Sequence, residues 1–162
     1  MESILFLDNW MIEKQTCLER VWHTPTYIKD VFTDYHPDVL GYGGYASMFW
    51  DERVDKYVMY TAVYPPEADP GTFVLRLESD DPYNWEDPTY DPSIEPVWKG
   101  FQNVVVDQNG RRFWPIYINS LQGTPFADQG YLMSTYHPGR SVNESIVGTS
   151  KDGLRFNIDN TR

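Results

Sequence analysis

The sequence predicts an all-β protein, and three observations lead to this fold class. Aromatic residues make up 16% of the 162 residues, and aromatic side chains favour strands. Twelve Pro and eleven Gly recur along the whole chain and limit any long helix. Short apolar runs alternate with clusters of turn-forming residues, a pattern typical of antiparallel strands. Hydrophobic residues reach 41% and charged residues 23%, which suits a globular protein with one ordinary core.

The strand pattern can be placed along the chain. The segments predicted to form strands are 4–13, 18–23, 45–50, 56–64, 72–78, 102–107, 112–119, 130–136 and 145–150. The run Asp107-Gln108-Asn109-Gly110 predicts a tight hairpin, because Asn-Gly tolerates the positive φ that such turns need. Residues 51–55 form a longer loop at the corresponding place of an earlier hairpin.

The two hairpins belong to a degenerate repeat. Each copy has two strands joined by the hairpin turn, residues 46–62 in the first copy and 103–118 in the second. A third strand follows in each copy, and it ends in a related hook of Ser, Asp and an aromatic residue, 79–85 and 150–156. Strand, hairpin, strand, loop, strand and hook is the order within one propeller blade. Chance similarity between two β-meanders is the alternative.

The repeat predicts a partial β-propeller with about two four-stranded antiparallel blades. Residues 1–162 would form a single propeller portion, divided into an N-terminal extension (1–43), a first blade (44–97) and a second blade (98–162). Blades bury their faces against neighbours, so two blades would leave an apolar flank exposed. We therefore expect either a fragment that lacks its C-terminal blades or a homo-oligomer that covers the flank.

Charge and targeting signals narrow the function class. The formal net charge of −11 repels phosphate backbones, so nucleic acid is not expected as a partner. The opening Met1-Glu2-Ser3-Ile4 has no basic region, and no signal peptide or membrane-spanning run is visible. A cytoplasmic location is the default expectation, and the lone Cys17 rules out an intrachain disulfide framework.

Three short motifs resemble a group of bacterial glycoside hydrolase-like proteins. The string Leu-Phe-Leu-Asp-Asn-Trp-Met-Ile-Glu at 5–13 looks like the opening of that group, and an Arg and a His-x-Pro follow within 18–25, as they do there. The hook Thr-Ser-Lys-Asp-Gly-Leu-Arg-Phe at 149–156 resembles the group's recurring Thr-Ser-x-Asp-Gly-x-x-Trp. The group is similar to the five-bladed propellers of glycoside hydrolase families 32 and 43.

The resemblance implies a sugar-binding funnel at the propeller axis and a pair of catalytic carboxylates. This chain departs from the pattern, because Gly-Tyr-Gly-Gly-Tyr at 41–45 stands where family 32 has Asn-Asp-Pro. Asp8, in the most distinctive string, is the first candidate acid, although it could instead cap a turn or pair with Arg20. Asp38 is the second, with a solvated loop acid as the alternative.

The predicted funnel rim carries aromatic and amide side chains. Aromatic rings stack on sugar C–H faces and amides bond hydroxyls, which suits a carbohydrate ligand. The candidate substrate-binding residues are Tyr42, Tyr45, Trp98, Gln102 and Asn103. Aromatic side chains also pack between blades, so Trp98 could equally lie in the core.

Metal and cofactor sites are not predicted. The three His residues are far apart and lack a paired zinc spacing. The acidic stretch 79–96 matches no calcium loop, and Gly41–Gly44 lacks the spacing and helix of a phosphate loop.

Two functions remain open from the sequence. The first is a glycoside hydrolase-like protein or fragment acting on a glycan. The alternative is a non-catalytic carbohydrate-binding or assembly module that oligomerises through its open flank. A sialidase-like propeller is weaker, because Asp152 and Gly153 are adjacent and do not have the Asp-x-Gly spacing of that family's Asp-box.

Overall fold

A computed structural model describes residues 24–27, 41–64, 73–85, 101–112, 117–136 and 145–158. Within these residues the fold is all-β, and the single helical element is the short 3-10 turn η1 (Ala127–Gln129). The predicted all-β class is therefore confirmed. No helix in the described ranges is long and apolar enough to cross a membrane.

The first sheet contains three antiparallel strands. They lie in the order β1 (Gly41–Asp51), β2 (Lys56–Tyr64) and β3 (Phe73–Ser79). β2 is the central strand, and its residues from Val58 to Val63 are all buried because both faces of the sheet are covered. Strands buried on both faces read as continuous apolar runs, which explains why 56–64 was readily predicted as a strand.

The second sheet contains five strands, of which four form a meander. β5 (Tyr117–Ser120), β6 (Tyr131–Tyr136), β7 (Ser145–Ser150) and β8 (Arg155–Ile158) pair antiparallel in chain order. β4 (Val106–Asp107) lies parallel to β8. Among the described residues the two sheets thus contain three and five strands with one parallel pairing, and the expected division into two four-stranded antiparallel blades is not confirmed. β8 was not predicted at all.

Residues 103–107 connect the two sheets. The N–H of Arg76 donates to the carbonyl of Asn103, and the N–H of Val105 donates to the carbonyl of Val74, both at 2.9 Å. Residues 103–105 thus extend the first sheet beyond β3, although the sequence predicted them to belong to the second blade. The next residue, Val106, pairs with β8. Side chains of this segment alternate between the two cores: Val105 lies in the core between the sheets, and Val104 and Val106 lie in the cluster on the other face of the first sheet.

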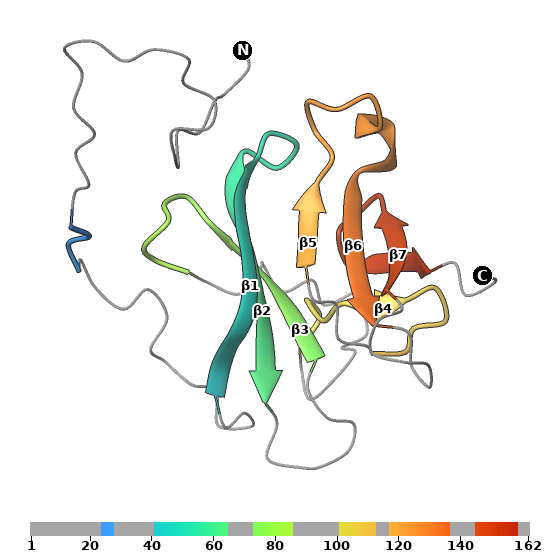
Figure 1. Cartoon of the computed structure of the whole chain (residues 1–162), viewed down its shortest axis with the longest axis horizontal. Helices are drawn as coiled ribbons and strands as arrows, with labels where there is room; N and C mark the ends of the chain where they lie inside the picture. Colours follow the sequence, from blue (N-terminus) through green and yellow to red (C-terminus); the bar gives the residue numbers. More distant parts are fainter. Residues whose placement is uncertain are drawn as a thin grey trace, which may run out of the picture.

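The main core lies between the two sheets, which stand beside each other in Figure 1. Its buried side chains come from both sheets: Val58, Tyr60, Val74, Val105, Ile118, Tyr131, Met133 and Phe156. A second cluster covers the other face of the first sheet: Val63, Phe73, Leu75, Phe101, Val104 and Val106. Each fully buried apolar side chain contributes about 1.5–3 kcal/mol, so the inter-sheet core is the main force that holds the sheets together.

A first Asp hook ends β3. Oδ1 of Asp81 accepts hydrogen bonds from the backbone N–H groups of Tyr83 (2.7 Å) and Asn84 (2.8 Å). The hydroxyl of Ser79, two positions earlier, accepts from the N–H of Asp81 at 3.2 Å. Trp85, four positions after the Asp, is buried at 8% exposure. The carboxylate therefore folds the chain back so that the next aromatic returns to the sheet.

A second Asp hook ends β7 with the same pattern. Oδ1 of Asp152 accepts from the backbone N–H groups of Leu154 (2.8 Å) and Arg155 (2.9 Å). Ser150 again stands two positions earlier, and its hydroxyl bonds Asp152 Oδ1 at 2.8 Å. Phe156, four positions after the Asp, is fully buried. The two hooks that the sequence paired are therefore alike in the backbone hydrogen bonds that their Asp carboxylates accept, whereas their Ser hydroxyls bond different partners.

Candidate functional site

A polar cluster around the buried Asp51 joins the two sheets at the end where the β1–β2 hairpin lies. We call Asp51, Arg53, Arg76 and Tyr131 the inter-sheet cluster. Alternation along β1 points Phe49 toward the second sheet, and Asp51 follows on the same face at the end of the strand. Arg53 lies in the hairpin turn, Arg76 in β3 and Tyr131 at the start of β6.

Every acceptor position of Asp51 is occupied. Oδ1 accepts from the backbone N–H (3.1 Å) and Nε (2.9 Å) of Arg53, while Oδ2 accepts from Arg53 Nη2 (3.1 Å) and from the hydroxyl of Tyr131. A carboxylate has about four acceptor sites, so none remains for a ligand. Burial alone would raise the pKa of Asp51, but the hydrogen bonds from Arg53 and Tyr131 outweigh it and hold the pKa below its usual value. Asp51 is therefore a buried, ionised anchor.

Tyr131 is the centre of the cluster. The guanidinium carbon of Arg53 lies 3.9 Å from the centroid of its ring, a cation–π contact. The ring also meets that of Tyr60 edge-on, with centroids 6.4 Å apart and an interplanar angle of 77°. Burial, followed by the hydrogen bond to Asp51, raises the pKa of Tyr131 to about 12. Its hydroxyl is therefore a neutral donor at all physiological pH values.

Arg76 and Tyr60 attach the second Asp hook to the first sheet. Nη1 of Arg76 donates to the carbonyl of Asp152 at 3.2 Å, and Tyr60 donates its hydroxyl to the carbonyl of Gly153 at 2.9 Å. Arg76 is only 7% exposed, and its charge is matched by Glu78 at 2.8 Å. Burial raises the pKa of Tyr60 above its ordinary value, which keeps this donor protonated.

A related arrangement occurs at the second hairpin. Oδ1 of Asp107 accepts from the backbone N–H groups of Asn109 and Arg111, both at 2.8 Å, and Oδ2 accepts from Arg111 Nε at 3.0 Å. The predicted turn is present, with Gly110 at φ +76°. Burial would raise the pKa of Asp107, but these hydrogen bonds lower it. Each hairpin thus begins with a buried Asp that holds an Arg of its own turn.

These geometries limit the chemistry available to the described acids. Asp51, Asp107 and Asp152 all have lowered pKa values, and each is bonded by donors of its own turn. A general acid in glycoside hydrolysis needs a raised pKa and access to the leaving oxygen. The inter-sheet cluster is consequently a device that holds loops in place and is not itself an acid–base pair.

The predicted site residues are only partly described. Asn103 is buried, and its side-chain Nδ2 donates to the carbonyl of Arg76 at 2.8 Å, while its neighbour Gln102 is half-buried. Tyr42 and Tyr45 lie on β1, and their side chains fall outside the description. The other three candidates also lie outside the described residues: Asp8, Asp38 and Trp98. The catalytic role of Asp8 and Asp38 and the sugar-binding role of the other five residues stay predictions.

Sequence reasoning missed the inter-sheet cluster. A signal was present for two of its members, because both hairpins carry an Asp followed closely by an Arg, Asp51 with Arg53 and Asp107 with Arg111. Tyr131 had no such signal, since its contact with Asp51 depends on how the sheets pack. Across the described ranges, no three His, Cys, Asp or Glu side chains come together as a metal site would need.

Comparisons of the chain with models of protein families, with curated proteins and with solved structures found no match.

Proposed function

We propose that the chain forms two neighbouring blades of a glycoside hydrolase-like β-propeller, and that it binds a glycan. The observation that carries this proposal is the recurrence of the Asp hook. Asp81 and Asp152 make equivalent hydrogen bonds at the ends of β3 and β7, and each is followed by a buried aromatic residue. Repetition of one turn at matching places is typical of propeller blades.

The arrangement of the sheets supports the same proposal. With residues 103–105 included, the first sheet has four strands, and β5–β8 supply four antiparallel strands of the second. The sheets pack face to face, and their first strands are neighbours, since the N–H of Ile118 on β5 donates to Ser47 Oγ on β1 at 3.1 Å. Neighbouring blades of a propeller pack in this way, with their first strands at the axis.

Within this proposal, binding and catalysis reside in different residues. Asp51, Asp107 and Asp152 hold turns, and the acid–base role in this proposal belongs to Asp8 and Asp38, the two candidates that the sequence offers. Sugar contacts would come from the predicted rim, of which Gln102 is a half-buried member.

The test is a binding and turnover experiment on the full chain. Isothermal calorimetry against neutral, amino-sugar and uronic-acid oligosaccharides should give saturable binding to at least one class. Release of reducing ends from the bound class would then be measured for the wild type and for Asp8→Asn and Asp38→Asn, and activity should fall in at least one variant. No binding across the panel would overturn the proposed function, whereas binding without turnover would leave glycan recognition and reject hydrolysis.

A second candidate function, assembly through an open flank, is favoured by the outer face of the second sheet. Tyr117, Leu132 and Val147 lie on this face, at 52%, 38% and 56% exposure. Tyr117 on β5 and Val147 on β7 both stand opposite Ser134 of β6, and Leu132 lies two positions before Ser134 on the same face. Light scattering over a concentration series should then show a defined oligomer that Val147→Glu returns to monomer. A monomer at every concentration would exclude this candidate.

A further inference from the structure

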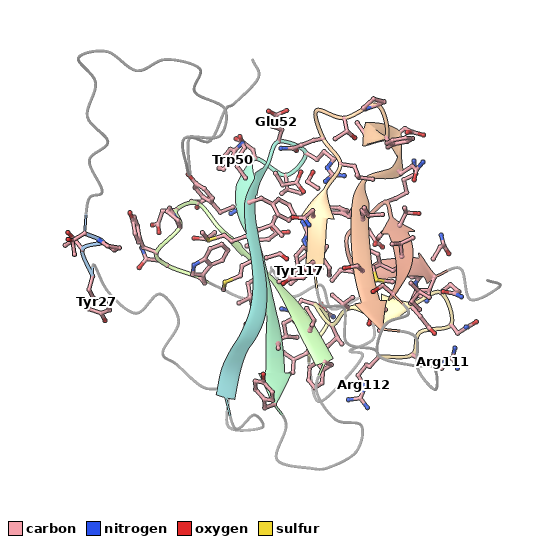
Figure 2. All side chains as sticks on the ribbon, in the orientation of Figure 1. Tyr27, Trp50, Glu52, Arg111, Arg112 and Tyr117 are labelled. Carbon is pink, nitrogen blue, oxygen red and sulfur yellow. The ribbon has the colours of Figure 1, made fainter. Side chains whose placement is uncertain are left out.

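We propose that Trp50, supported by Tyr57, forms a stacking platform for a single neutral sugar ring. This site is separate from the predicted funnel rim, and it rests on the proposed function because it names where on the described surface a glycan would bind. Trp50 is 39% exposed on the face of β1 that points away from the second sheet. Figure 2 shows it beside the β1–β2 hairpin, at the same end of the strand as Glu52.

The indole ring is held from below by its cross-strand partner. Trp50 stands directly opposite Tyr57 in the register, and their ring centroids are 5.0 Å apart at an interplanar angle of 75°. Tyr57 is half-buried and packs on the cluster formed by Met59, Leu77 and Trp85. Trp50 therefore packs nearly perpendicular to an anchored ring, while part of its surface stays open to solvent. Edge-to-face pairs of this kind add about 0.5–1.5 kcal/mol beyond area burial.

The backbone beneath the ring is also fixed from the second sheet. Gln122 donates its side-chain Nε2 to the carbonyl of Trp50 at 2.9 Å, and its Oε1 accepts from the N–H of Glu52 at 3.0 Å. The side-chain amide of Gln122 therefore bonds the backbone of Trp50 and Glu52 in the way that a neighbouring strand would. A platform that is ordered before binding loses little conformational entropy when the ligand arrives.

The charges around the platform select a neutral ligand. Glu52 is exposed next to Trp50, and the exposed pair Lys56–Asp80 (2.9 Å) balances its own charge. With a chain charge of −11, a uronic acid or sulfated sugar would be repelled. A neutral pyranose can instead stack its C–H face on the indole while its hydroxyls donate to the Glu52 carboxylate.

The experiment compares Trp50→Ala, Trp50→Phe and the control Tyr117→Ala, which removes an aromatic residue on the other sheet that is 52% exposed. Calorimetry with neutral gluco-, manno- and galacto-oligosaccharides should show about tenfold or greater weakening for Trp50→Ala. Trp50→Phe should weaken binding less, because a smaller ring is kept, and Tyr117→Ala should bind as the wild type does. Circular dichroism and thermal unfolding would verify that each variant is folded.

The outcomes separate this inference from the function on which it rests. If the wild type binds a neutral glycan and Trp50→Ala binds it equally well, the Trp50 site is wrong and the proposed function stands. If the wild type binds the uronic-acid oligosaccharides of the panel under the proposed function more tightly than the neutral ones, the neutral-sugar assignment is wrong. If the wild type binds no glycan, the proposed function itself fails.

Discussion

Tyr131 on β6 donates a hydrogen bond from its hydroxyl to Oδ2 of Asp51 at the end of β1, which joins residues 80 positions apart in the chain. The contact ties the first hairpin to the second sheet at a fully buried carboxylate. Arg53 completes the arrangement, because it bonds the same carboxylate and stacks on the same ring. The relative placement of the two sheets therefore depends on a specific polar contact as well as on apolar packing.

Asp51→Asn should reduce the free energy of unfolding by about 2–3 kcal/mol, since it leaves Arg53 and Tyr131 facing a neutral amide in a buried site. Urea denaturation at pH 7 measures the change. Asp55→Asn is the matched control, because Asp55 is exposed and its φ of +55° is tolerated by Asn. Equal denaturation midpoints for Asp51→Asn and the wild type would contradict the anchoring role.

The lowered pKa of Asp51 also fixes a pH dependence for this contribution. The folded pKa lies below the unfolded value near 4, so the stabilisation is fully present above that value and is lost as pH falls through the folded pKa. Between pH 5 and pH 2 the wild type should lose stability more steeply than Asp51→Asn. Parallel curves for the two proteins would show that Asp51 does not titrate as described.

Tyr131 and Tyr60 should ionise above the ordinary tyrosine range. Burial raises both pKa values, that of Tyr131 to about 12. Because the folded pKa values are raised, these two tyrosines stabilise the fold below the unfolded tyrosine pKa near 10. This stabilisation is lost as pH rises through their folded pKa values. In an ultraviolet absorbance titration, a fraction of the tyrosines should ionise only at high pH, together with unfolding. This fraction should be smaller in Tyr131→Phe. Ionisation of all tyrosines in one step near pH 10 would contradict this burial.

Gly153→Ala should destabilise the protein far more than Gly123→Ala. Both glycines have φ of +75°, so the backbone strain of about 1 kcal/mol is shared. A Cβ at Gly153 would press on the hydroxyl of Tyr60 and lie 2.9 Å from Cε2 of Tyr131, whereas a Cβ at Gly123 meets nothing within 4 Å. Thermal unfolding should separate the two variants by at least ~2 kcal/mol. Similar losses in both would argue against the docking of the second hook on the first sheet.

Asp81→Ala and Asp152→Ala should have similar effects, because each carboxylate accepts hydrogen bonds from the backbone N–H groups two and three positions further along the chain. Each substitution removes the acceptor for two backbone N–H groups and should cost about 1–2 kcal/mol. Chemical denaturation measures both, with the exposed Asp128→Ala as control. A loss confined to one hook would weaken the view that they are copies of one repeat.

The sequence predicted the fold class and several strands because those signals are local. β2 at 56–64 and β7 at 145–150 were predicted with the bounds that the structure has, since in each case a short apolar run lies between clusters of turn residues. β8 was missed although Phe156 and Ile158 alternate with polar residues, because a strand of four residues carries little pattern. The parallel pairing of β4 with β8 is a long-range contact and leaves no local trace.

The candidate site was harder to predict for the same reason. The hooks were recognised from Ser, Asp and aromatic spacing, which a local carboxylate–backbone turn requires. Tyr131 lies far from both Arg76 and Asp51 in the chain, so its hydrogen bonds with these two residues follow only from the packing of the sheets. Trp50 stood within a predicted strand, but strand alternation alone did not say which face would be open.

The most direct test of the packing that underlies this account is a double-mutant cycle between Asp51 and Tyr131. Unfolding free energies of the wild type, Asp51→Asn, Tyr131→Phe and the double variant would be measured by urea denaturation at pH 7. Direct contact between the two sheets predicts a coupling energy of about 1 kcal/mol or more. Additive effects, with coupling near zero, would contradict the inter-sheet contact and with it the arrangement of two neighbouring blades.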